Sequence, residues 1–293
     1  MLLSVESINT RTGVILQIWE VGGKKPRYVQ PPFKPYMYSL KPTPRGRPVK
    51  KRLLSDPSKP RTVWKLVFPR TDILEANRNI WTIEDDLPFI QRIAIDIGYR
   101  FPSKPPRLLA WDIETKTAGL CPDWRKDKII SIACWGDTPE SHKFFYGDEK
   151  TVIKEFLAFV RRYDPDVLID YWGRFYDIPC LMQRCTQLRI KCSLGRDGSP
   201  PYILKREFER RGKGKIEHKI RINGRVHFDV QKEVDADYSL TLAGIKDRKL
   251  KTVAKYFGLN PVEAPADKPI HELPMEELRR YNLSDARCTY QLA

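Results

Sequence analysis

Proline divides this chain into two parts with different folding options. The first hundred residues contain Pro-Pro-Phe-Lys-Pro at 31–35 and Lys-Pro-Thr-Pro-Arg-Gly-Arg-Pro at 41–48, and no long helix can run through either segment. Short apolar runs at 13–19 and 62–68 predict strands, and only residues 84–97 have a helical pattern. This part of the chain is therefore predicted to be a small β-rich module.

The segment Pro102-Ser-Lys-Pro-Pro106 predicts a stiff linker, because clustered prolines favour extended backbone and stop a helix. We expect one domain at 1–106 and a second at 107–293. In the second, the apolar patterns predict strands at 107–114, 129–135, 142–146 and 166–170, with helices at 151–163 and 178–190. Strands followed by helix-connected strands indicate an α/β fold, with helices flanking a mixed sheet.

The chain carries a large positive charge. Its 53 Lys and Arg residues against 37 Asp and Glu give a net charge of +16, which predicts contact with a polyanion such as DNA or RNA. Basic clusters occur at 41–52, 205–221 and 246–251. The 205–221 cluster is predicted to be a hairpin, and the sequence leaves open whether it is a basic arm or a solvated ribbon.

Several classes are excluded by composition. No apolar run approaches the roughly 20 residues that span a bilayer, and an acid at position 6 is too early for a signal peptide, so we expect a cytoplasmic protein with no membrane partner. The six cysteines contain no C-x-x-C pair and are predicted to be buried thiols. The four histidines lack metal-ligand spacing, which argues against a zinc nuclease.

Three groups of acids are candidates for chemistry. Asp112 and Glu114 lie two apart in a predicted strand and therefore share a face. Asp177 lies where a strand gives way to a helix, in a position suited to capping that helix. Tyr281 and Asp285 lie four apart on the inward stripe of a helix that follows Pro274. Each group has an ordinary structural explanation when it is taken alone: a polar strand edge, a cap, or a buried acid paired with a cation.

The loop before Asp177 reads Tyr171-Trp-Gly-Arg-Phe-Tyr176 and combines four aromatic residues with one arginine. Aromatic rings can stack on bases and a guanidinium can hold a phosphate. We therefore expect Trp172, Arg174, Phe175 and Tyr176 to bind nucleic acid.

In order and spacing, these motifs resemble the proofreading domain of family B DNA polymerases, of the archaeal type. This domain is an RNase H-like 3′–5′ exonuclease that uses three Asp, one Glu and a Tyr. Asp112-Ile-Glu114-Thr resembles its first motif, Tyr171 to Leu181 its second, and Tyr281-Asn-Leu-Ser-Asp285 its third. Segments at 224–229, 238–240 and 250–255 also resemble this family, and 33–38 and 86–89 resemble the polymerase N-terminal domain.

The resemblance implies a catalytic set of Asp112, Glu114, Asp177, Tyr281 and Asp285. The four acids would bind two Mg²⁺ or Mn²⁺ ions, since all-oxygen ligands favour hard cations. Asp112 would bridge the ions, Glu114 and Asp285 would hold the ion on the side of the nucleophile, and Asp177 would bind at or beside the second ion. The implied reaction releases nucleoside 5′-monophosphates from single-stranded DNA 3′ ends, and a prokaryotic protein would be nucleoid-associated.

Two departures from the family pattern leave alternatives open. Trp172, Arg174 and Tyr176 replace the usual second-motif residues. The 293 residues leave no sequence for palm, fingers or thumb, so we expect no polymerisation by this chain alone. The alternative is a weak or inactive polymerase-like subunit that binds single strands or a replication partner. The chain could also be an excised fragment, or the first piece of a split polymerase whose partner carries those domains.

Overall fold

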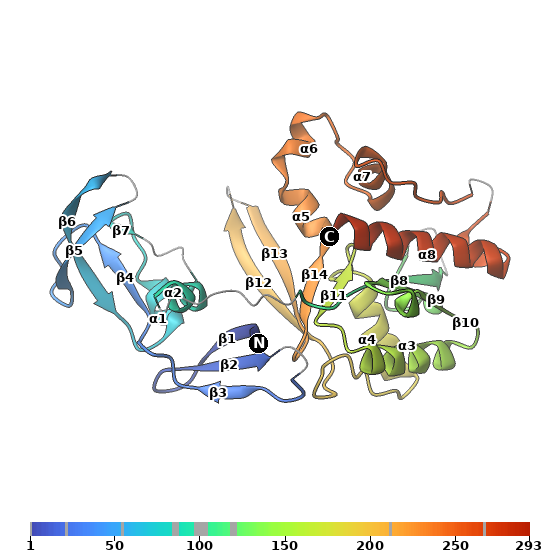
Figure 1. Ribbon diagram of the computed structural model, residues 1–293, viewed down its shortest axis with the longest axis horizontal. Helices are drawn as coiled ribbons and strands as arrows, with labels where there is room; N and C mark the ends of the chain where they lie inside the picture. Colours follow the sequence, from blue (N-terminus) through green and yellow to red (C-terminus); the bar gives the residue numbers. More distant parts are fainter. Residues whose placement is uncertain are drawn as a thin grey trace. The chain divides into compact units, whose positions relative to one another are not determined.

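The computed structural model describes residues 2–20, 23–53, 56–83, 88–96, 105–117, 122–210, 213–265 and 268–293 (Figure 1). The chain divides into two compact units, one of residues 1–20 and 26–103 and the other of residues 21–25 and 104–293. Among the described residues, no helix has both the length and the apolar character needed to cross a membrane.

The first unit is built from two small antiparallel sheets. One has the order β1-β2-β3 and the other β5-β6-β4-β7. The strands are β1 (Leu2–Asn9), β2 (Val14–Glu20), β3 (Arg27–Val29), β4 (Tyr36–Ser39), β5 (Arg47–Leu53), β6 (Asp56–Val67) and β7 (Thr82–Ile83). The predicted β-rich module is thus confirmed.

Two helices accompany these sheets. Helix α2 (Phe89–Asp96) falls inside the predicted 84–97 helix, of which residues 84–87 and 97 lie outside the described ranges. Its Phe89 and Ile93 pack with Val14 and Leu16 of β2 in a small core. Helix α1 (Thr71–Ala76) was not predicted, because six residues with one buried side chain, Leu74, carry little helical periodicity. Most of the predicted proline linker also lies outside the described residues.

The second unit is a five-stranded mixed sheet of order β10-β9-β8-β11-β14. Its strands are β8 (Leu108–Lys116), β9 (Lys128–Gly136), β10 (Lys143–Tyr146), β11 (Val167–Asp170) and β14 (Val226–Asp229). Strands β8, β9 and β10 are antiparallel neighbours, whereas β11 runs parallel to both β8 and β14. The predicted mixed α/β architecture is confirmed, and β8 lies at the centre of the sheet.

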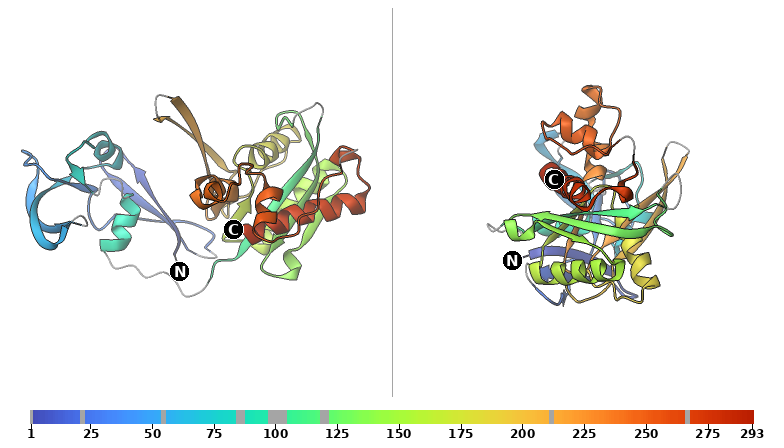
Figure 2. Two further views of the ribbon diagram at one scale, coloured as in Figure 1. Left: turned by 90° about the horizontal axis from the view of Figure 1, so that it is seen from above. Right: turned by 90° about the vertical axis from the view of Figure 1, so that its right-hand side faces the viewer.

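Helices cover both faces of this sheet (Figures 1 and 2). Helices α3 (Glu149–Tyr163) and α4 (Asp177–Gln187) pack on one face, and α8 (Met275–Leu292) lies along the other. The remaining helices are α5 (Val230–Ala236), α6 (Tyr238–Leu242), α7 (Leu250–Tyr256) and the 3₁₀ turns η1 (Pro139–Ser141) and η2 (Ile270–Glu272). The core between the sheet and α3 includes Trp111, whose ring stacks on that of Phe156 at 4.9 Å.

The basic segment does form a hairpin, with strands β12 (Tyr202–Arg210) and β13 (Lys213–Arg221) paired in register. The five described cysteines are free and buried, as predicted; Cys121 lies outside the described residues.

Candidate active site

Strand β8 presents two carboxylates on one face. Its buried residues Trp111 and Ile113 pack in the core on the α3 side, so Asp112 and Glu114, which alternate with them, face the side that α8 covers. Both acids are half-buried. The predicted strand therefore places its acids together, next to a helix.

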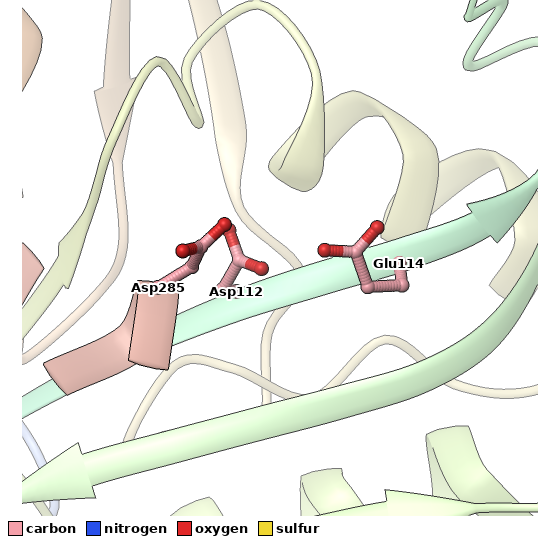
Figure 3. Close-up of side chains that lie close together, drawn as sticks. All are labelled: Asp112, Glu114 and Asp285. Atoms are coloured by element: carbon pink, nitrogen blue, oxygen red, sulfur yellow. The ribbon is translucent and has the colours of Figure 1, made fainter. Parts of the chain in front are cut away.

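Helix α8 brings a third carboxylate to this pair. Asn282 Nδ2 donates to Asp112 Oδ2 at 2.7 Å, and Ser131 Oγ on β9 donates to Asn282 Oδ1 at 3.0 Å. These bonds fix the helix on the sheet at the level of Asp285, one turn further along. Ligand oxygens of Asp112, Glu114 and Asp285 lie within 4.8 Å of one another (Figure 3).

Asp177 reaches the same region from the opposite face of the sheet. It is the first residue of α4 and only 5% exposed, and its Oδ1 accepts the Ile113 N–H at 3.2 Å. The expected capping role is wrong, since Tyr176 is the N-cap residue and the carboxylate reaches out to β8. Asp177 is not one of the three acids grouped within 4.8 Å, but it lines one cavity with Asp112 and Glu114.

This cavity has a volume of about 430 Å³, which lies in the lower part of the range of about 300–1,000 Å³ typical of ligand sites. The rings of Tyr171, Trp172 and Tyr176 also line it. Acids and aromatic rings therefore share a space comparable to a small-ligand site.

The acids are held in a setting that disfavours their charged forms. Burial raises the pKa of Asp112 well above its usual range, and the negative charges of Asp177 and Asp285 raise it further. Burial and the charge of Asp112 likewise raise the pKa of Glu114. For Asp177, burial and the neighbouring Asp170 raise the pKa. A cation bound among these oxygens would relieve both the burial penalty and the repulsion.

The donor set fits a hard divalent ion. Carboxylate oxygens are the ligands that Mg²⁺ and Mn²⁺ prefer, and three carboxylates can approach one ion at this spacing. No thiol or imidazole belongs to this group of described residues, so its chemistry differs from that of a zinc site.

Lys251 of α7 also belongs to the site, because it contacts Asp285, although the sequence analysis assigned it no role. Its Nζ lies 2.7 Å and 3.0 Å from the two carboxylate oxygens of Asp285 and donates to the Val262 carbonyl at 2.6 Å. Burial raises the pKa of Asp285, and the ammonium of Lys251 opposes that rise. The one indication of Lys251 in the sequence was its position in the segment at 250–255, which resembles the same polymerase family.

Tyr281 lies one turn before Asp285 and is half-buried. Its ring sits 3.8 Å from Lys251 Nζ, which also binds Asp285. Burial and the charges of Asp285 and Glu114 raise its pKa, so the phenol stays protonated at neutral pH. It can therefore donate a hydrogen bond or orient a water, but it is a poor base.

The aromatic loop is anchored by an acid on the neighbouring strand. Asp229, which is opposite Asp170 in the parallel pairing of β11 and β14, accepts the backbone N–H of Trp172 at 3.0 Å. It also pairs with the Arg174 guanidinium at 2.7 Å. A Cβ atom on Gly173 would lie 2.1 Å from Asp170 Cγ, so only glycine fits there.

The four predicted nucleic-acid contacts are not equivalent. Trp172 is 46% exposed, lines the cavity, and is parallel to the ring of Tyr176 at 6.5 Å. Arg174 is only 12% exposed and would have to leave Asp229 to bind a phosphate. Phe175 lies beside His218 of the hairpin at 5.1 Å and is not among the residues that line the cavity.

Comparisons with known proteins agree with this fold. Residues 136–253 match the family model described as DNA polymerase family B, exonuclease domain. The DNA polymerase of Thermococcus sp. (strain 9oN-7) is 30% identical over 85% of this chain, and that of Pyrococcus glycovorans is 29% identical over 83%. A family B DNA polymerase structure from Pyrobaculum calidifontis has the same fold over the whole chain, with a TM-score of 0.68 at 22% identity.

The family model and these relatives indicate the class of the chain, which corresponds to the N-terminal and exonuclease region of a DNA polymerase. Residues 136–253 carry the exonuclease domain of family B DNA polymerases, and the chain is homologous to archaeal members of that family over about 85% of its length. It spans 32–33% of the length of the two relatives named above and 14% of the Thermococcus litoralis DNA polymerase.

Proposed function

We propose that this chain is a metal-dependent 3′–5′ exonuclease that removes nucleotides from the 3′ ends of single-stranded DNA. The observation that carries this proposal is the convergence of Asp112 and Glu114 from β8 with Asp285 from α8, within 4.8 Å. Asp177, from a third element, lines the same cavity as Asp112 and Glu114. The net charge of +16 favours binding of a polyanion despite this acidic centre.

The four acids would hold two Mg²⁺ or Mn²⁺ ions, and the chemistry that such ions supply is activation of a water and stabilisation of the leaving 3′ oxygen. Asp112, whose carboxylate oxygen lies within 4.8 Å of those of Glu114 and Asp285, would take part in holding both ions. Glu114 and Asp285 would hold the ion on the side of the attacking water, and Asp177 would act at or beside the second ion.

The other side chains would position the reactants. Tyr281, which is protonated and lies one turn before Asp285, would orient the attacking water through its hydroxyl. Trp172 and Tyr176 would offer ring faces to the terminal bases. The Asp229 carboxylate would keep the backbone of this loop in place.

A labelled single strand incubated with Mg²⁺ or Mn²⁺ tests the proposal. The parent protein is expected to shorten the strand, and the Asp112→Ala, Glu114→Ala double variant is expected to leave it intact while remaining folded. A folded parent protein that leaves the strand intact with either metal would overturn the proposal.

A second candidate function is a non-catalytic module that binds single strands or docks on a chain carrying palm, fingers and thumb domains. The pairing of Lys251 with both oxygens of Asp285 favours it, because an incoming ion must compete with a resident ammonium. In that case the parent protein would bind single-stranded DNA but would neither cleave it nor bind Mn²⁺.

A further inference from the structure

The cavity contains little that can receive a phosphate. Its acids are Asp112, Glu114 and Asp177, and its phenols are Tyr171 and Tyr176. Among the described residues that line it, only His271 has an ionisable nitrogen. A phosphodiester entering this space would meet negative charge on most sides unless cations and hydrogen-bond donors offset it.

His271 is brought to the cavity by a short, well-anchored segment. The 3₁₀ turn η2 (Ile270–Glu272) is closed by the Glu272 N–H to Pro269 carbonyl bond at 3.0 Å, and Pro274 follows before α8 begins. The next side chain, Leu273, is buried, and η2 contacts β8. The turn therefore holds the imidazole at a defined place beside the acids.

The imidazole is available to a ligand. Its side chain is 19% exposed, and Nε2 lies 3.9 Å from Oε1 of the exposed Glu272, which is too long for a hydrogen bond. No hydrogen bond of this ring occurs within the described part of the chain. Within the described residues, the imidazole is therefore not held by a hydrogen bond, and its only charged neighbour within ion-pair distance is the exposed Glu272.

The nearby cations are already engaged. Lys251 binds Asp285 and the Val262 carbonyl, and Arg174 binds Asp229. Neither residue lines the cavity. Among the described residues that line the cavity, this leaves His271 as the ionisable nitrogen that can reach a substrate without breaking a hydrogen-bonded ion pair.

We propose that His271 contacts the terminal phosphodiester of the single strand and positions it over the acids. This proposal rests on the proposed exonuclease function, since it concerns the substrate of the same cavity. It assigns His271 to substrate binding and not to the metal-ligand set, which consists of carboxylates.

The test compares His271→Ala and His271→Gln with the parent protein and with His142→Gln. His142 is a suitable control, because its ring stacks on Trp135 at 3.6 Å and does not line the cavity. We expect His271→Ala to raise KM for a single strand about tenfold, as for loss of a hydrogen bond to a charged group, with little change in kcat. His271→Gln, which keeps an N–H donor, is expected to recover part of that loss.

Two further readouts separate the possible outcomes. Mn²⁺ affinity measured by calorimetry is expected to be the same in the parent and His271→Ala; a clear loss would make His271 a metal-site residue and overturn the proposal. Binding of a labelled thymidine trinucleotide with Ca²⁺, measured by fluorescence anisotropy, is expected to weaken in His271→Ala.

This binding measurement also works if the parent protein proves inactive, so failure of the proposed function and failure of this inference are distinguishable. Equal trinucleotide affinity in the parent, His271→Ala and His142→Gln would reject a contact by His271, whatever the nuclease assay shows.

Discussion

The ammonium of Lys251 binds both carboxylate oxygens of Asp285, at 2.7 Å and 3.0 Å, and also lies over the ring of Tyr281. A helix at 250–256 thereby supplies a positive charge to the third motif. Whether the ion pair stabilises the metal-free site can be measured directly.

Lys251→Met is expected to destabilise the metal-free protein by about 1–3 kcal/mol, because removing one partner leaves a buried carboxylate uncompensated; the partial exposure of Lys251 places the value below that of a fully buried pair. Lys255→Met is the matched control, since that lysine pairs with Glu263 at the surface of the same region. Urea unfolding with and without Mn²⁺ measures both effects. Equal losses in the two variants would show that the Lys251 pair contributes nothing special.

The raised carboxyl pKa values predict how stability depends on pH. A carboxyl whose pKa is higher in the folded than in the unfolded protein contributes stability below the unfolded pKa, near 4, and loses it as pH rises through the folded pKa. The pKa values of Asp112, Glu114 and Asp177 are raised in this way. Metal-free protein should therefore lose the contribution of these groups on the way to neutral pH, and Mn²⁺ should stabilise it more as pH rises.

The variant Asp112→Asn tests this linkage. It is expected to raise the Tm of metal-free protein at neutral pH and to reduce the Tm gain from Mn²⁺. Glu276→Gln, an exposed acid at the start of α8, serves as the control and should change neither quantity. An unchanged response to Mn²⁺ in Asp112→Asn would argue against a metal site at this residue.

Arg174 can be tested as an anchor or as a phosphate contact. Since its guanidinium binds Asp229, Arg174→Ala is expected to lower the unfolding free energy by about 1–3 kcal/mol and to leave the salt dependence of DNA binding unchanged. A phosphate contact would instead reduce the slope of log affinity against log salt by about one. Arg125→Ala, in an exposed pair with Asp123, is the control for stability.

Trp172 is expected to stack on a base. Trp172→Ala should weaken single-strand binding by roughly 1–3 kcal/mol, the value typical of one base–aromatic stack. Tyr146→Ala, which removes a half-exposed ring of β10 that does not line the cavity, should leave binding unchanged. Fluorescence titration with oligo-dT measures both. Matching affinities for the two variants would remove Trp172 from the binding surface.

Much of the site could be predicted because its signals are local. The alternation around Asp112 and Glu114 predicted β8, and spacings of three and four predicted the inward side of α8, where Leu278, Asp285 and Cys288 are buried. Both patterns reflect burial of one face of an element, which the chain encodes within a few residues.

The missed residues depend on contacts between distant segments. Asp229 meets the loop at 172–174 only because β14 pairs in parallel with β11, and Lys251 meets Asp285 across 34 residues. His271 enters the cavity from a 3₁₀ turn with no apolar periodicity. Such placements follow from strand register and helix packing, which a pattern within one element does not specify.

Release of product from a 5′-labelled single strand with Mn²⁺ tests the central claim most directly. The account predicts a ladder that shortens from the 3′ end, with nucleoside 5′-monophosphates identified by mass spectrometry, and no products from the Asp112→Ala, Glu114→Ala variant. An intact strand, internal cuts, or release of 3′-monophosphates by the folded parent protein would contradict it.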